Sequence, residues 1–273
     1  MQQDYTIKCQ ELAKELRKAI IETAHDVGKL SIHFGASMSI AEILAVLYGY
    51  AMKYDAKNPE MEDRDRLILS KGHAYPALYC ILSLCGYFSK EELKANYMTD
   101  GGLFPAHPIK NLSKGIECSS GSLGNGLSFA VGKTLNAKKK NLEYTTYAIV
   151  GDGECEEGSI MEAFMAAAQL KLDNLVVFID CNKMQQDGTT EEVLSIDFQP
   201  LLSALGWDVI SLDGNDVGQI IQALDNRGKD GKPLAIIANT IKGKGISFME
   251  NDNKWHHAAL NKKQYEQVIQ ELS

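Results

Sequence analysis

Residues 151–182 read GDGECEEGSIMEAFMAAAQLKLDNLVVFIDCN, and this stretch decides the fold. An apolar run, YTTYAIV at 144–150, comes directly before it, and a second apolar run, NLVVFID, covers 174–180. The segment between them, 156–171, carries an apolar stripe at helical spacing. The stretch therefore predicts a strand–helix–strand unit whose two strands are parallel and whose crossover is right-handed.

The alternation of strand and helix continues toward the C-terminus. Further strands are predicted at 207–213 and 233–241, with helices at 197–205 and 216–226. Because the strands are almost continuously apolar, they are typical of a parallel sheet covered on both faces. We predict one doubly wound α/β domain over residues 1–273, with a mainly parallel sheet.

The first half of the chain is predicted to be mostly helical. Leu12, Leu16 and Ile20 recur at helical spacing in a long amphipathic N-terminal segment. A polar stretch follows at 28–37, and a helix over 39–52 is predicted with Ser39 as its cap. The other predicted elements are a strand and tight turn at 66–74, helices at 75–86, 89–93 and 124–140, and an ordered loop at 99–126.

Composition and charge argue against a nucleic-acid-binding protein and against a membrane-spanning one. The net charge of −8 argues against a nucleic-acid partner, which would need a basic stripe. The six cysteines form no CxxC pair, and we interpret them as free thiols in a reducing cytoplasm. No apolar run approaches the ~20 residues of a membrane span.

Asp152 and Asn182 follow the two strands of the opening unit. Parallel neighbouring strands end at the same sheet edge, ~5 Å apart, where ligands of open α/β folds bind. A carboxylate and an amide oxygen are hard ligands for Mg²⁺, and such sites often share phosphate oxygens of a substrate. Gly151 and Gly153 allow a tight turn and the approach of a phosphate to the backbone. An isolated GDG is also common in plain β-turns, so the rest of the chain has to decide.

The spacing of GDG and Asn182 resembles the metal–diphosphate motif of thiamine-diphosphate enzymes. The segments SIHFGASMSIAEILAVLY, LSKGHA, FPAHP, SSGSLGNGLSFAVG, GDGECEEG and NTIKGKGISFMENDNKWHHAAL occur in the order found in transketolases. The resemblance covers essentially the whole chain, but only the N-terminal, diphosphate-binding part of a full-length transketolase. It resembles the N-terminal subunit of a split transketolase.

The resemblance implies a thiamine-diphosphate-binding fold and a set of ligands. Asp152, Asn182 and the carbonyl of Met184 would hold Mg²⁺, for which Ca²⁺ or Mn²⁺ could substitute, and Gly153 would approach the diphosphate. The residues expected beneath the aminopyrimidine and thiazolium rings are Gly121, Ser122 and Leu123. Family members often have Pro where Ser122 stands, a conservative change for a backbone contact.

Four histidines occupy family positions: His33, His73, His107 and His256. By resemblance, His33, His107 and His256 face the first carbons of the substrate, and His73 lies nearer the diphosphate. Imidazole suits proton transfer near neutral pH. His25 and His257 are interpreted as structural, although the chain has HH where family members usually have HG, which leaves open which of His256 and His257 takes the role.

The acids of GDGECEEG have two interpretations. Glu154, Glu156 and Glu157 suit a helix start, where acids are favoured by the dipole. By resemblance, Glu157 also belongs to an acidic chain that links two active sites across a two-fold axis, which makes it a candidate catalytic residue.

The resemblance further implies a partner. In transketolases a second domain supplies the carboxylate and aromatic contacts to the pyrimidine ring, across a subunit interface. We therefore expect the partner to be a C-terminal transketolase subunit, in a heterotetramer with two-fold self-association that transfers a two-carbon ketol unit between sugar or sugar-phosphate substrates. The alternatives are the alpha chain of a 2-oxo-acid dehydrogenase E1, a 1-deoxyxylulose-5-phosphate synthase, which is a longer chain, and a catalytically silent interaction subunit.

Overall fold

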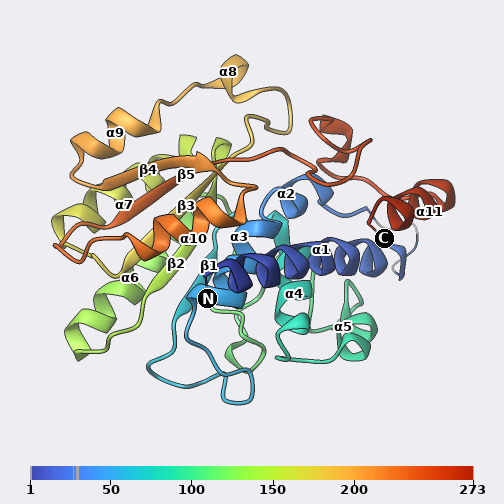
Figure 1. Cartoon of the computed structure of the whole chain (residues 1–273), viewed down its shortest axis with the longest axis horizontal. Helices are drawn as coiled ribbons and strands as arrows, with labels where there is room; N and C mark the ends of the chain where they lie inside the picture. Colours follow the sequence, from blue (N-terminus) through green and yellow to red (C-terminus); the bar gives the residue numbers. More distant parts are fainter. Residues whose placement is uncertain (1, 27, 29–30, 273) are drawn as a thin grey trace.

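The computed structural model describes residues 2–26, 28 and 31–272 of the chain (Figure 1). Its strands are β1 (Arg66–Leu69), β2 (Thr146–Gly151), β3 (Leu175–Cys181), β4 (Asp208–Asp213) and β5 (Leu234–Asn239). Its α-helices are α1 (Gln2–Asp26), α2 (Phe34–Met38), α3 (Ala41–Val46), α4 (Tyr75–Leu84), α5 (Lys90–Asn96), α6 (Asn125–Lys140), α7 (Gly158–Gln169), α8 (Thr190–Val193), α9 (Phe198–Ala204), α10 (Val217–Asp225) and α11 (Lys262–Glu271). Short helical turns are η1 (Leu47–Ala51), η2 (Gly72–Ala74), η3 (Leu112–Lys114), η4 (Gly153–Glu156) and η5 (Asn253–Trp255).

The five strands form one parallel sheet in the order β1-β2-β3-β5-β4. β2 and β3 are neighbours, and Gly151 at the end of β2 pairs with Asp180 near the end of β3. The predicted strand–helix–strand unit is therefore present, and the prediction of a doubly wound α/β fold is confirmed. The register brings Asp152 and Asn182 to the same edge of the sheet.

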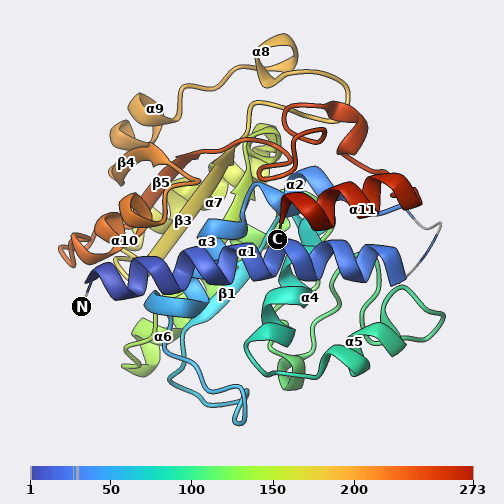
Figure 2. The same cartoon turned by 45° about the vertical axis from the view of Figure 1, so that its right-hand side comes forward.

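Apolar side chains alternate between the two faces of the sheet. In β2, Tyr147 and Ile149 belong to one buried cluster, whereas Ala148 and Val150 belong to the other. The first cluster joins the sheet to α1, α3, α4 and α10, and the second joins it to α6, α7 and α9. Figure 2 shows α1 lying across the face that carries α3 and α10. Burial on both faces explains why the strand sequences are almost continuously apolar.

The segment around Ser39 differs from the prediction. The stretch expected to be a polar loop contains α2, and α3 begins after Ile40 rather than with Ser39 as its cap. Ser39 has helical backbone angles, φ −60° and ψ −31°, and ends α2, whereas an N-cap residue has non-helical angles. Its hydroxyl donates to Asp180 Oδ2 at 2.7 Å, a contact with β3.

One segment of the described chain, residues 34–51, is long and apolar enough by composition to span a membrane. In the structure 83% of this segment is buried. It contributes α2, α3 and η1 to the core on the α1 face of the sheet, and this burial accounts for its composition.

Candidate active site

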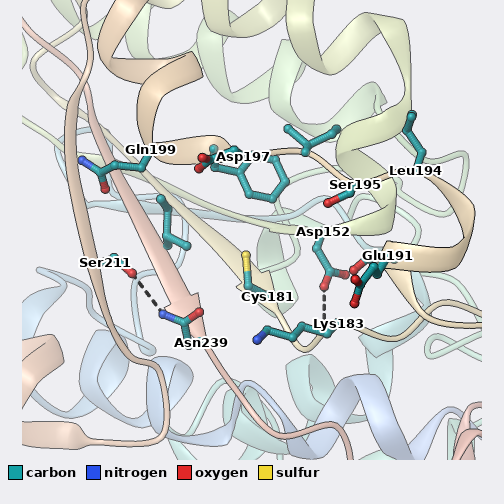
Figure 3. Close-up of a pocket in the computed structure, with 14 residues that line it drawn as sticks. Asp152, Cys181, Lys183, Glu191, Leu194, Ser195, Asp197, Gln199, Ser211 and Asn239 are labelled. Carbon is teal, nitrogen blue, oxygen red and sulfur yellow. Dashed lines mark hydrogen bonds between the residues drawn. The ribbon is translucent and has the colours of Figure 1, made fainter.

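Asp152 lies at the carboxyl edge of the sheet, between the end of β2 and η4. Its side chain is buried, with Oδ1 accepting from the backbone N–H of Gly153 at 2.9 Å and Oδ2 from that of Lys183 at 2.7 Å (Figure 3). Burial, and then the neighbouring Asp180 carboxylate, raise the pKa of Asp152 to about 6. A buried carboxylate that accepts only backbone N–H groups is suited to receiving a cation.

Asn182 and Met184 line the same cavity as Asp152. The Asn182 side chain is oriented by two hydrogen bonds: its Nδ2 donates to Asp180 Oδ2 at 3.0 Å, and its Oδ1 accepts from the Met184 N–H at 3.1 Å. The cavity lining thus includes one carboxylate, one amide oxygen and the backbone of Met184, whose carbonyl accepts from Lys242 Nζ at 3.3 Å. This oxygen donor set fits Mg²⁺ or Ca²⁺ better than a transition metal. Among the described residues there is no cluster of three or more His, Cys, Asp and Glu placed to hold a metal.

Asp180, which the sequence reasoning missed, organises the floor of the site. It is fully buried, and its carboxylate accepts hydrogen bonds from Ser39, Thr240, Asn182 and Lys71. Three of these donors, Ser39, Lys71 and Thr240, come from distant parts of the chain, so Asp180 ties the end of β3 to α2, β1 and β5. The available signal was its place two residues before Asn182.

Two buried lysines, Lys71 and Lys242, also line the cavity and were not predicted. Lys71 Nζ pairs with Asp180 and donates to the Ala36 carbonyl at 3.0 Å. Lys242 Nζ donates to the Met184 and Gln185 carbonyls at 3.3 and 3.2 Å and to Asn253 Oδ1 at 2.9 Å. Burial, and then Lys71, lower the pKa of Lys242 to about 8. Because both lysines line the cavity at the carboxyl edge of the sheet, the cavity favours an anionic ligand.

The structure brings the four predicted histidines into this cavity. His33 precedes α2, His73 lies in η2, His107 lies in the loop before η3, and His256 follows η5; all four line the cavity. The His33 ring centroid is 5.4 Å from those of His73 and His256 and 6.3 Å from that of His107. Elements that are far apart in sequence thus place the imidazoles around one point.

Three of these imidazoles are held uncharged, and burial, then Lys71, lower the pKa of His73 well below its usual value. Burial, and then His257 and His256, lower the pKa of His33 to about 3. Burial, and then Lys242, lower the pKa of His256 to about 4. Nδ1 of His33 and of His256 is buried with no hydrogen-bond partner in the described part of the chain. Neutral imidazoles with an unused nitrogen are ready to accept or donate a proton to a ligand.

His256 and His257 have separate positions. His256 is part of the cavity lining, whereas His257 is more exposed and does not line it. His257 is nevertheless not an isolated loop residue, because its ring lies 4.5 Å from that of His33. The other histidine interpreted as structural, His25, stacks on Tyr265 at 4.0 Å, with α1 and α11 carrying the two rings.

Gly121 and Leu123 line the cavity, while Ser122 is exposed and lies outside the lining. Gly121 has a φ of +140°, and a Cβ at this position would lie 2.7 Å from the His107 ring. Only glycine therefore allows the 120–124 segment to pass beside His107. Leu123 is 38% exposed, which is unusual for an apolar side chain at a cavity.

Glu154 and Glu157 occupy different environments. Glu154 is buried, and it accepts from Ser70 Oγ at 2.6 Å and from the N–H groups of Gly124 and Gly151 at 2.9 and 3.1 Å. Glu154 lies in the first turn of η4, as expected of a helix-start acid, and in addition it joins the end of β1 and the start of α6 to the end of β2. Glu157 is exposed and precedes α7.

Asp152 also lines a second cavity of about 430 Å³, larger than the histidine-lined cavity of about 290 Å³ (Figure 3). The second cavity lies between the ends of β3, β4 and β5 and residues 190–199. In this second cavity Asn239 Nδ2 donates to Ser211 Oγ at 3.0 Å (Figure 3). None of the four histidines lines it, so the smaller cavity is the better candidate for the chemistry.

Comparisons with known proteins agree on one family. Residues 10–273 match the family model described as transketolase, thiamine diphosphate binding domain. The chain is 42% identical to the 6-deoxy-6-sulfo-D-fructose transketolase subunit SqwG of Clostridium sp. (strain MSTE9), covering 97% of this chain and 96% of that protein. It is 40% identical to an apulose-4-phosphate transketolase subunit of Phocaeicola vulgatus, covering 94% of this chain and 91% of that protein.

Solved structures agree with this result. The transketolase from Leishmania mexicana superposes with a TM-score of 0.89 at 30% identity. That match covers 97% of this chain but 41% of the longer protein. The chain belongs to the transketolase family, in which it corresponds to the thiamine diphosphate binding domain.

Proposed function

We propose that the chain is the N-terminal subunit of a two-subunit transketolase, which transfers a two-carbon ketol unit from a ketose or its phosphate to an aldose or its phosphate. The observation that carries this proposal is the convergence of His33, His73, His107 and His256 on the cavity that also holds Asp152 and Asn182. The alpha chain of a 2-oxo-acid dehydrogenase E1 needs the metal ligands but not this set of imidazoles.

The residues of the cavity fit a metal–diphosphate group. Asp152, Asn182 and the Met184 carbonyl would hold Mg²⁺, with Ca²⁺ or Mn²⁺ as substitutes. Lys71, Lys242 and the backbone at Gly153 offer positive charge and close approach to a diphosphate. When bound, thiamine diphosphate supplies the nucleophilic carbon that the ketol transfer needs.

The histidines would transfer protons to and from the substrate. His33 and His256, kept neutral by burial and with a free Nδ1 among the described residues, would bind hydroxyl groups of the sugar and move protons at them. His107 is exposed at the rim and would contact the same end of the substrate, while His73 would orient the cofactor. Gly121 and Leu123, which line the cavity, would form the wall beneath the cofactor rings, and Ser122 between them would contribute its backbone.

A second polypeptide would complete the site. The cavity of about 290 Å³ is at the small end of ligand pockets, which span ~300–1,000 Å³, as expected when another chain supplies part of the wall. The relatives named as transketolase subunits match this chain over nearly their whole length. In our proposal the partner is a C-terminal transketolase subunit, the assembly is a heterotetramer built on a two-fold axis, and the location is cytoplasmic, for which the six free cysteines are suited.

Reconstitution tests the proposal. The purified chain should lack glycolaldehyde transfer alone and gain it when mixed with a partner that carries the pyrimidine-binding domain, in the presence of thiamine diphosphate and Mg²⁺. Substantial turnover by the single chain would contradict the need for a partner. Decarboxylation of a 2-oxo acid without ketol transfer by the mixture would favour the E1 alternative.

A further inference from the structure

The backbone places His33 and His257 directly opposite each other. Ile32 and Ala258 form an isolated antiparallel bridge, in which the Ile32 N–H donates to the Ala258 carbonyl at 2.8 Å and the Ala258 N–H donates to the Ile32 carbonyl at 3.0 Å. In antiparallel register the next opposed pair is His33 and His257. Since the Ile32–Ala258 pair exchanges both hydrogen bonds, the next pair is the kind whose side chains approach most closely.

The side chains follow this backbone arrangement. The ring centroids of His33 and His257 are 4.5 Å apart, with an angle of 44° between the planes. The other rings near His33 are more distant, at 5.4 Å for His73 and His256 and 6.1 Å for Tyr75. With Nδ1 of His33 unbonded within the described residues, ring packing holds this imidazole, and His257 is its nearest ring.

The pair is asymmetric in exposure. His33 is partly buried and lines the cavity, whereas His257 is exposed on its solvent side. Two imidazoles at this separation resist being protonated together. The other charged or titratable groups acting on His33 are His256 and Lys242 from the C-terminal segment, His107 from the loop before η3, and, through ring contact, His73 and Tyr75.

We propose that His257 is a positioning residue that holds the imidazole of His33 in place and helps to keep it uncharged. The inference rests on the proposed role of His33 in the ketol transfer. His257 has no contact with the cavity itself and acts only through its neighbour.

Three variants separate the two parts of this role. His257→Ala removes both the ring contact and the charge, His257→Phe keeps a ring opposite His33 without the charge, and His25→Ala removes another exposed, stacked histidine far from the cavity as a matched control. In the reconstituted enzyme at pH 8, His257→Ala should lower kcat ~10- to 100-fold with little change in cofactor affinity, since a displaced reacting group costs rate. His257→Phe should recover most of this loss at pH 8.

Histidine titration gives a readout that a merely structural role would not move, because His257 is the largest influence after burial on the lowered pKa of His33. NMR of the labelled full chain, which needs no substrate, should show the His33 titration midpoint rising in both His257 variants but not in His25→Ala, with His33→Gln assigning the signal.

Two measurements, the His33 titration midpoint and kcat at pH 8, decide whether His257 positions His33. An unchanged His33 midpoint in His257→Ala, or failure of His257→Phe to restore kcat at pH 8, would overturn the proposal. A raised midpoint in a protein that shows no ketol transfer would support the pairing while removing the proposed function, so the two failures are distinguishable.

Discussion

At the scale of the residue, Asp152 is a buried carboxylate whose hydrogen bonds come from backbone N–H groups. Its two oxygens accept hydrogen bonds from backbone N–H groups of Gly153 and Lys183, and its pKa is raised to about 6 by burial and by Asp180. Lys183 itself has a φ of +61°, a left-handed conformation that non-glycine residues rarely adopt. Burial and backbone strain concentrated on one short turn are typical of a functional site.

Replacing Asp152 with alanine is expected to remove metal-dependent cofactor binding while the fold survives. The carboxylate lies at a strand end and is not one of the apolar side chains of the core clusters, so its loss should leave the sheet intact. Calorimetry on the reconstituted complex should show cofactor affinity in Mg²⁺ at least ~100-fold weaker. Asp187→Ala, an exposed acid in the same loop, is the control. An unchanged Mg²⁺ dependence would mean that the metal motif has been misassigned.

Because His33 and His256 are neutral in the folded chain, we expect its free energy of unfolding to depend on pH. The pKa values of His33 and His256 are about 3 and about 4 in the fold, below the unfolded value of 6.5. Below pH 6.5 the unfolded chain therefore binds protons that the folded chain does not, and stability is lost as the pH falls toward 4. Each histidine contributes about 1.4 kcal/mol per pH unit in this window.

Urea unfolding of the cofactor-free chain at pH 7.5 and 5.5 measures this effect. The free energy of unfolding should fall less between the two pH values in the double variant His33→Gln, His256→Gln than in the wild type. His25→Gln should behave as the wild type. If the free energy of unfolding fell equally between the two pH values in all three proteins, the assignment of neutral buried imidazoles would be wrong.

At the scale of the element, the site depends on how four segments are held at one sheet edge. Glu154 joins the end of β1 to the start of α6, and Asp180 joins the end of β3 to α2 and to Lys71. The prediction that Ser39 caps a helix was wrong because Ser39 has helical backbone angles at the end of α2, where its hydroxyl donates to Asp180. These buried polar contacts fix where the cavity walls meet.

Lys71→Met is expected to destabilise the chain by about 3 kcal/mol or more, because it leaves the buried Asp180 carboxylate without a cation. Chemical denaturation gives the comparison. Lys53→Met, which removes an ion pair with Asp63 on the surface, should cost far less, because solvent screens an exposed pair. Similar losses in the two variants would contradict the energetic importance of the Asp180 network.

At the scale of the whole molecule, the start of α7 is where our proposal puts the two-fold interface. Glu157 is exposed at its start, and Met165 on the same helix is 51% exposed. By resemblance, Glu157 would meet its symmetry mate across a two-fold axis, where one residue acts twice. The fold leaves this position open to solvent and therefore accessible to a second copy.

Glu157→Ala is expected to weaken both self-association and thiamine-diphosphate affinity, with an excess of either partly restoring the other. Analytical ultracentrifugation of the variant with its partner, with and without cofactor, measures the assembly. Glu162→Ala, an exposed acid further along α7, is the control. If assembly and cofactor affinity both match the wild type, Glu157 is a helix-start acid only.

The sequence by itself determined the order of strands and helices, the parallel sheet and the edge at which Asp152 and Asn182 lie. These follow from short-range periodicity and from the handedness of crossovers, which are local properties of the chain. The histidine set and the family also came from sequence, through motifs quoted in order. Only the tertiary structure decided the roles of Asp180, Lys71, Lys242 and Glu154, since burial and pairing of a charge depend on segments that meet from distant parts of the chain. The same holds for His257: the HH pair leaves its role open in the sequence, and the bridge between Ile32 and Ala258 is what brings its ring against His33.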